Sequence, residues 1–289
     1  MSPAPILVTG ATGRLGRLVV ERLTARGQSV RVFTRRPDVA RKLFGTAVQI
    51  AVGEFADGTS VEAALRGVGR LLLLSPISPT LAADQIAVAN AAAAAGAHRI
   101  VKISGSAWTI DPPGNSISGD AHAAVEYHLG KLPLETVSLR PNAWMQVSLA
   151  NTIRQALAGN PVFAADPDAG IGYIDARDIA HVAVHQLLAD TVAGEALNLT
   201  GPAAVTARQA ASLLSGALKR PVAVIARPPA AVSPDADFEH RAVAEFARLI
   251  AAGRAAVSTD TVTSLTGRTP RSVESFISEQ LAAEAALAG

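Results

Sequence analysis

Cysteine is absent from the 289 residues of the chain. Disulfide bonds, thiolate catalysis and cysteine metal sites are therefore excluded. Aromatic residues make up only 4% of the chain and charged residues 17%, whereas 49% are hydrophobic, so we expect a core of Ala, Val, Leu and Ile. The net charge is +2 and no long basic run occurs, which argues against nucleic acid as a partner.

Long hydrophobic runs are absent as well. No uninterrupted apolar stretch reaches the ~20 residues that a membrane-spanning helix needs. The alanine-rich stretch 91–95 is bounded by polar residues, so it is more typical of a helix that packs closely on a sheet. The first apolar run begins at Ile6 and leaves little room for a secretion signal. We therefore expect a cytoplasmic protein without a membrane partner.

The first apolar run leads into three glycines, Gly10, Gly13 and Gly16. Residues 6–9 are typical of a buried parallel strand, and residues 15–23 repeat apolar positions at helical spacing. At such a turn the glycines permit a tight bend, close approach of a pyrophosphate and close helix packing. The helix N-terminus adds N–H donors for the anion. The spacing differs from the usual dinucleotide fingerprint, yet in this context it predicts a nucleotide-phosphate site.

The next expected strand ends close to Arg35 and Arg36. An acidic residue at this place would bind the ribose 2′-hydroxyl of NAD. No carboxylate is present beside Arg35, and a guanidinium pairs well with a 2′-phosphate. The sequence therefore predicts NADPH as the cofactor. The alternative is that both arginines are solvated cations beside a helix.

Strand and helix patterns alternate through the first half of the chain. This alternation predicts an α/β fold with a doubly wound parallel sheet of the Rossmann type over residues 1–140. Residues 141–289 are less regular and predict a smaller α+β lobe that covers the substrate. Within it we expect a short strand at residues 171–174, and part of residues 171–199 is expected to return to the sheet. Ligands bind at the carboxyl ends of the strands in such sheets.

Four stretches carry a resemblance to a known family: residues 8–13, 53–57, 122–126 with 139–142 soon after, and 265–272. With these motifs the chain resembles the NmrA-like atypical short-chain dehydrogenases/reductases, and especially NADPH-dependent quinone reductases of the second type and triphenylmethane reductase. The resemblance implies a C-terminal lobe that closes on the substrate. It also implies cofactor contacts from Gly10, Ala11, Thr12, Gly13, Arg14, Leu15, Gly16, Arg35, Arg36, Glu54, Phe55, Leu74, Ser75, Pro76, Ser104 and Gly105.

The usual catalytic pair of short-chain dehydrogenases, Tyr-x-x-x-Lys, has only a misplaced match. Tyr127 and Lys131 have the spacing, but Lys131 lies too close to the next expected strand. When Glu126 is placed on the family's glutamate, His122 takes the lysine position and Ser118 the tyrosine position. The tyrosine general acid is therefore missing.

This absence favours some acceptors over others. A simple ketone develops an alkoxide that needs a positioned proton donor, whereas a quinone gives a far less basic phenolate and a cationic dye gives a neutral product. We therefore expect a small conjugated acceptor. His122 is the candidate catalytic proton donor; the alternative is a helix residue that orients the neighbouring loop.

The remaining candidates concern the substrate and metals. Trp108, Asn142 and Trp144 follow expected strands and could line an aromatic-binding cleft, although the tryptophans could equally fill the core. His181 and His185 have the spacing of a zinc pair but no evident third ligand, so no metal site is expected.

Three functions remain open. The favoured one is an NADPH-dependent reductase of a quinone-like or other conjugated acceptor. The first alternative is a protein that senses NADP(H) without chemistry, and the second is an isomerase or epimerase. A homodimer is a possible assembly.

Overall fold

The computed structural model describes residues 4–229, 231–233 and 235–288. The chain divides into two compact units. The first unit comprises residues 1–105, 118–140 and 179–197, and the second comprises residues 106–117, 141–178 and 198–289.

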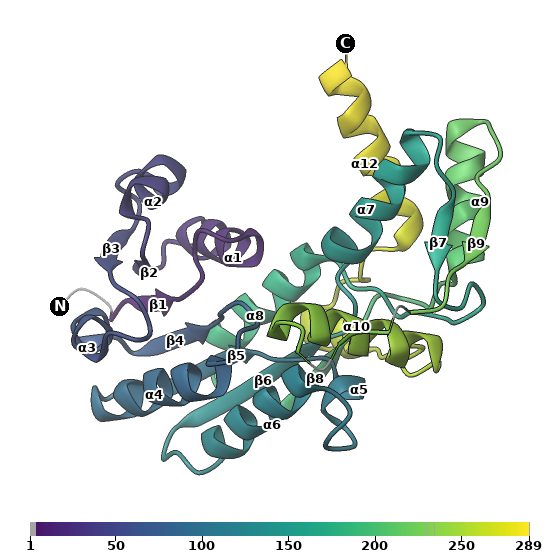
Figure 1. The fold of residues 1–289 in the computed structure, drawn as a ribbon. Helices are drawn as coiled ribbons and strands as arrows, with labels where there is room; N and C mark the ends of the chain where they lie inside the picture. The colour runs from purple at the N-terminus through teal and green to yellow at the C-terminus, as the bar shows by residue number, and fades with distance from the viewer. Residues whose placement is uncertain (1–3, 230, 234, 289) are drawn as a thin grey trace. The chain divides into compact units, whose positions relative to one another are not determined.

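The first unit is built on a seven-stranded sheet with the order β3-β2-β1-β4-β5-β6-β8 (Figure 1). The strands are β1 Ile6–Val8, β2 Val30–Thr34, β3 Gln49–Val52, β4 Arg70–Leu73, β5 Arg99–Ile103, β6 Glu135–Pro141 and β8 Ala196–Leu199. The helices are α1 Arg14–Thr24, α2 Pro37–Phe44, α3 Gly58–Leu65, α4 Leu81–Ala94, α6 Ile117–Leu129 and α8 Ala176–Leu188. Neighbouring strands from β3 to β6 pair in parallel, which confirms the predicted doubly wound sheet.

One face of this sheet carries an apolar cluster. Leu65 of α3, Val88 of α4 and Val125 of α6 pack there against strand residues such as Leu71 and Ile100. All five side chains are at most 1% exposed. Aliphatic side chains from three helices therefore cover this face, and the polar residues lie at the carboxyl ends of the strands.

The reversal of strand order falls between β1 and β4, and one hydroxyl joins the two strands there. The Thr9 Oγ1 atom lies 2.8 Å from the Leu74 carbonyl oxygen and accepts a hydrogen bond from the Leu74 N–H at 2.8 Å. Thr9 is fully buried. The glycine turn after β1 is therefore tied directly to the end of β4.

At the other end of the strands from the glycine turn, a buried arginine connects neighbouring elements. Arg99 on β5 is 2% exposed and pairs with Glu135 on β6 at 2.5 Å. Its guanidinium also donates to the carbonyl oxygens of Gln186, Ala189 and Asp190 at 2.9, 2.5 and 2.9 Å. The guanidinium thus connects β5, β6 and the end of α8 through one planar group.

The second unit contains mostly helices. Its elements are α5 Ala107–Ile110, α7 Met145–Leu157, β7 Val162–Ala164, α9 Ala207–Leu218, β9 Val224–Ala226, α10 Phe238–Ala251, α11 Thr261–Thr266 and α12 Val273–Ala288. Strands β7 and β9 form a small parallel pair. Helix α9 begins with a capping box between Thr206 and Gln209. The main apolar core of the second unit includes Met145, Leu149, Leu214 and Phe276.

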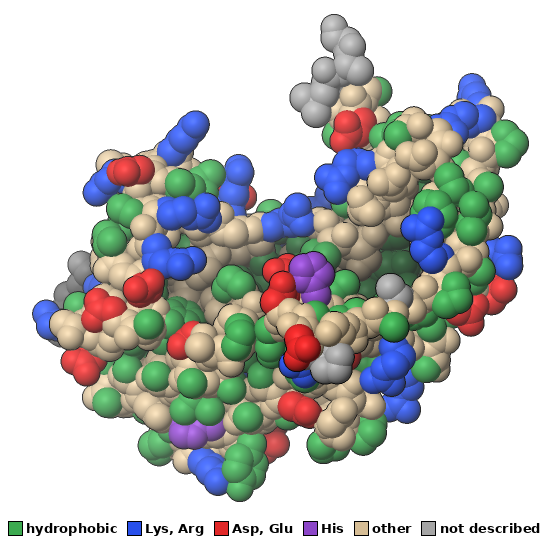
Figure 2. Space-filling model, viewed as in Figure 1, with side chains coloured by type: hydrophobic (Ala, Val, Ile, Leu, Met, Phe, Trp, Pro, Cys, Tyr) green, Lys and Arg blue, Asp and Glu red, His purple; other side chains and the backbone are tan. Residues whose placement is uncertain are grey.

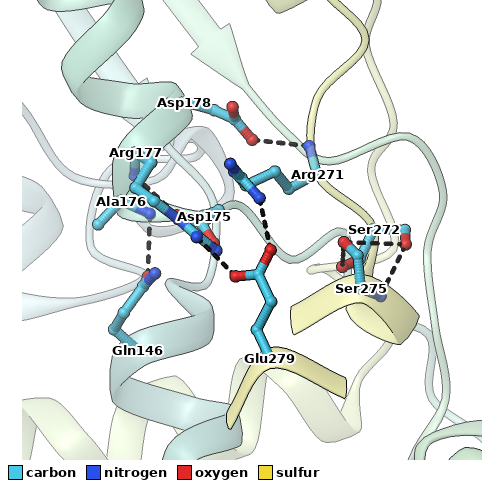
Figure 3. Close-up of polar contacts among 9 residues, drawn as sticks. All are labelled: Gln146, Asp175, Ala176, Arg177, Asp178, Arg271, Ser272, Ser275 and Glu279. Carbon is cyan, nitrogen blue, oxygen red and sulfur yellow. Dashed lines mark hydrogen bonds and ion pairs between the residues drawn. The ribbon is translucent and has the colours of Figure 1, made fainter. Parts of the chain in front are cut away.

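An ion-pair network fixes α12 within this unit (Figure 3). Arg177 binds Asp175 at 2.6 Å and Glu279 of α12 at 2.6 Å, and Arg271 binds Glu279 at 2.7 Å. Asp178 accepts the Arg271 N–H at 2.8 Å. Burial alone would raise the pKa of Asp175, but hydrogen bonds and charge from Arg177 bring that pKa below its usual value. Asp175 is therefore a carboxylate at neutral pH.

Parts of the second half differ from the sequence-based expectation. The strand expected at residues 171–174 is wrong, because only the isolated bridges Ile171↔Val205 and Trp144↔Ile174 form there. Helix α7 and strand β7 were not among the expected elements. No helix within the described ranges is long and apolar enough to cross a membrane.

Candidate active site

The glycine turn has the geometry of a phosphate-binding loop. Gly10 has a φ of +61°, and a Cβ atom there would lie 3.0 Å from the Leu74 carbonyl oxygen. A Cβ atom on Gly16 would collide with the carbonyl oxygen of Gly10. Gly13 is the N-cap of α1, which has no side-chain cap and no acidic residue in its first turn. The Gly13 N–H donates to the Gly10 carbonyl oxygen at 3.0 Å, and the start of α1 that follows is a place where a dinucleotide diphosphate can bind.

The residues around the glycines are partly buried and partly exposed. Ala11 and Leu15 are buried in the core, whereas Thr12 is half-buried and Arg14 is exposed. Arg36 donates to the Thr12 hydroxyl at 3.0 Å, so it reaches over the glycine turn. Arg35 is exposed beside it. Among the predicted 2′-phosphate ligands, the structure therefore brings Arg36 to the loop.

Basic side chains gather over α1 and α2 (Figure 2). Two of them are neutralised locally, since Arg17 pairs with Glu21 and Arg41 pairs with Asp38, both at 2.7 Å. Arg35 forms no ion pair with any described residue. This leaves positive charge at the end of β2, where the adenosine phosphate of a dinucleotide would lie.

The ends of β3 and β4 supply the next predicted contacts. Phe55 stacks on Phe33 with ring centroids 6.1 Å apart, and Glu54 beside it is exposed. Leu74 and Ser75 are half-buried, and Pro76 is exposed. The Ser75 hydroxyl accepts a hydrogen bond from Gln85 of α4 at 2.8 Å.

A buried polar cluster lies where β5, α6 and β6 meet. Lys102 of β5 donates to the Ser104 hydroxyl at 2.8 Å and lies 2.9 Å from His122 Nδ1. The Ser104 hydroxyl donates to Glu126 at 2.5 Å. Arg140 of β6 binds the same carboxylate at 2.5 and 3.1 Å. The five side chains form one continuous chain of hydrogen bonds, and half-buried Gly105 follows it directly.

Burial controls the charges in this cluster. It lowers the pKa of Lys102 to about 7, against the attraction of Glu126 and with help from Arg140. Burial and the charge of Lys102 together lower the pKa of His122 well below its usual value. His122 is thus a neutral imidazole at pH 7, as proton relays require.

The three predicted substrate residues all belong to the second unit. Trp108 donates to Asn142, meets Phe246 edge-on at 5.8 Å, and is only 7% exposed. Asn142 in turn donates to the Ala255 carbonyl oxygen at 3.0 Å. Trp144 is half-buried at the start of α7. Trp108 and Asn142 thus form a buried pair, and Trp144 is not part of it.

The same unit contains a cavity of about 420 Å³. It is lined by residues that include Tyr173, Val205, Leu213 and Val273. Trp108, Asn142 and Trp144 do not line it.

Both tyrosines of the chain lie outside the polar cluster. Tyr127 is 71% exposed on α6, and the Lys131 ammonium lies 3.8 Å from its ring centroid. Tyr173 belongs to the apolar core of the second unit, where burial raises the pKa of its phenol. Ser118, at the position of the family's tyrosine, is buried.

Three residues of the site were not predicted: Thr9, Lys102 and Arg140. Lys102 has the clearest signal in the sequence, since a lysine inside the run Arg-Ile-Val-Lys-Ile interrupts an otherwise apolar buried strand. Arg140 stands in a stretch that carries the family resemblance, but its partner is fourteen residues away in the chain.

Comparison with known proteins identifies the class. The model of an NAD(P)H-binding family matches residues 10–190. A (4-alkanoyl-5-oxo-2,5-dihydrofuran-3-yl)methyl phosphate reductase from Streptomyces griseus is 35% identical over 221 residues, 75% of each chain. An NAD(P)H azoreductase from Xenophilus azovorans is 30% identical over 223 residues, 76% of each chain.

Solved structures agree with the fold. The NADPH complex of an Escherichia coli NADPH-dependent quinone oxidoreductase has a TM-score of 0.85 at 24% identity, with 96% of this chain and 99% of that chain covered. The Citrobacter sp. triphenylmethane reductase complexed with NADP(H) has a TM-score of 0.79 at 21% identity, with the same coverage. The chain belongs to the NAD(P)H-binding family. Within that family it is an NAD(P)H-dependent oxidoreductase.

Proposed function

We propose that this protein transfers hydride from NADPH to a small conjugated acceptor such as a quinone, an azo compound or an unsaturated lactone. When bound, the reduced nicotinamide supplies the hydride. The observation that carries the proposal is the composition of the buried cluster. It holds His122, Lys102 and Ser104 but neither tyrosine of the chain. A site of this kind lacks the phenol that protonates a simple alkoxide.

Each predicted group has a role in this proposal. The glycine turn and the first turn of α1 hold the diphosphate, and Arg36 with Arg35 holds the 2′-phosphate. Ser75, oriented by Gln85, offers its hydroxyl at the end of β4. His122 donates the proton that a reduced quinone or lactone needs.

The names of the relatives support this acceptor class. The Streptomyces griseus enzyme is a reductase of a dihydrofuranone, and the Xenophilus azovorans enzyme is an azoreductase. Both kinds of molecule carry conjugated double bonds. The alternative of a non-catalytic NADP(H) sensor is not favoured, because these relatives are named as enzymes.

The proposal is tested by following NADPH absorbance with a benzoquinone, an azo dye, a butenolide and a saturated ketone. We expect turnover with at least one conjugated acceptor and none with the saturated ketone. Absence of turnover with every conjugated acceptor, in a protein that binds NADPH by calorimetry, would refute the proposal.

A further inference from the structure

Lys102 is a buried member of the cluster to which the proposed function gives no role. Its side chain is fully buried, in the interior of β5 and between Val101 and Ile103. Burial of an ammonium group is costly, and an apolar residue of similar length would fill the same space. Packing alone therefore does not explain why a lysine occupies this position.

The contacts of Lys102 have a defined direction. An ammonium group has three donors and no acceptor, so it donates to His122 Nδ1 at 2.9 Å and to Ser104 Oγ at 2.8 Å. A neutral imidazole that accepts at Nδ1 carries its proton on Nε2. The Ser104 hydroxyl gives its own hydrogen to Glu126, whose carboxylate is held by Arg140. Two of the three ammonium donors and the Ser104 hydroxyl hydrogen are thereby assigned.

We propose that Lys102 is a positioning residue that sets the tautomer of His122 and supplies, through that ring, the proton consumed in acceptor reduction. This inference rests on the proposed function. A quinone gains a hydride and one proton to become a neutral hydroquinone. The His122 Nε2–H bond breaks as the product O–H bond forms, and one Lys102 N–H bond breaks as the Nδ1–H bond forms. Lys102 becomes a neutral amine. A proton from water then adds to His122 Nε2 while the Nδ1 proton returns to the Lys102 amine, which restores the ammonium group and the first tautomer.

The charges around Lys102 suit this role. The titratable groups that face it are His122 and Glu126 on α6 and Arg140 on β6, while neighbouring β4 is apolar at Leu72 and Leu73. A pKa of about 7 allows the ammonium to release a proton at neutral pH. The lowered pKa of His122 keeps Nδ1 ready to accept it.

The kinetic test compares two acceptors in the full-length protein. A quinone requires a proton, whereas a cationic triphenylmethane dye becomes neutral on accepting hydride alone. In Lys102→Met we expect the ratio of quinone kcat to dye kcat to fall by about tenfold or more, as for loss of a proton donor. Lys131→Met, which removes an ammonium from the exposed Tyr127 ring, should leave that ratio unchanged. An equal loss with both acceptors would overturn the proposal and indicate a structural role.

A second measurement needs no turnover. Nitrogen NMR of the ring of His122, assigned among the six histidines with His122→Gln, reports the tautomer directly. In the wild-type protein we expect the proton on Nε2 and a change at Nδ1 as the pH passes about 7. Loss of that change in Lys102→Met supports the proposal, and identical titrations in both proteins would overturn it. If the wild-type protein reduces no acceptor, the proposed function fails, while this NMR result still decides whether Lys102 controls His122.

Discussion

Replacement of Lys102 by methionine should change how the stability of the protein depends on pH. The two side chains have similar length, so the substitution removes a buried amine and leaves the packing of β5 largely intact. Ser104 keeps its hydrogen bond to Glu126. The main effect is therefore electrostatic.

The magnitude follows from the pKa of the buried amine. Burial lowers the pKa of Lys102 from 10.5 to about 7. Between these values the unfolded state binds more protons than the folded state, so wild-type stability rises with pH. Each pKa unit is worth about 1.4 kcal/mol, which gives about 5 kcal/mol across the window. The penalty is complete below pH 7 and disappears above pH 10.5.

The assay is denaturant unfolding followed by circular dichroism at several pH values in this window. Methionine cannot titrate, so Lys102→Met should be more stable than the wild-type protein near neutral pH by several kcal/mol. This advantage should shrink steadily toward alkaline pH. Lys131→Met controls for loss of a lysine as such. A difference between Lys102→Met and wild type that stays constant over the window would refute the electrostatic reasoning.

Three further predictions concern the cofactor turn and the sheet. Gly16→Ala should abolish NADPH binding in calorimetry, because its methyl group would strike the Gly10 carbonyl; Gly216→Ala, whose methyl group meets nothing within 4 Å, is the matched control and should bind normally. Arg36→Ala should weaken NADPH much more than NADH, with Arg41→Ala, removed from an existing ion pair, as the control; equal losses for both cofactors would contradict a 2′-phosphate role. Arg99→Met should lower the free energy of unfolding by about 3 kcal/mol, because three carbonyl groups and Glu135 lose their partner; a thermal melt unchanged from wild type would exclude that role.

The local features of the nucleotide half could be predicted from the sequence. The apolar run at Ile6, the glycine triplet and the helical period after it are contiguous, and short-range sterics determine their structure. The capping box between Thr206 and Gln209 is local in the same way. Each of these features is complete within a single strand, turn or helix.

Long-range contacts could not be predicted in this way. Lys102 meets His122 across twenty residues and Glu126 meets Arg140 across fourteen, so the cluster exists only once the sheet has formed. The choice of Arg36 rather than Arg35 to contact Thr12 depends on how the chain enters α2. Ile171 and Ile174 have strand-like residues around them, but each finds only a single partner.

The Thr9 hydroxyl has a consequence for how the protein can evolve. The hydroxyl donates to the Leu74 carbonyl oxygen and accepts from the Leu74 N–H. The turn that follows β1 and the loop that follows β4 are therefore held together as one rigid segment. A mutation in this segment that changes the preferred acceptor would also disturb coenzyme binding. Substitutions that change the preferred acceptor should instead accumulate in segments that are not bonded to this one.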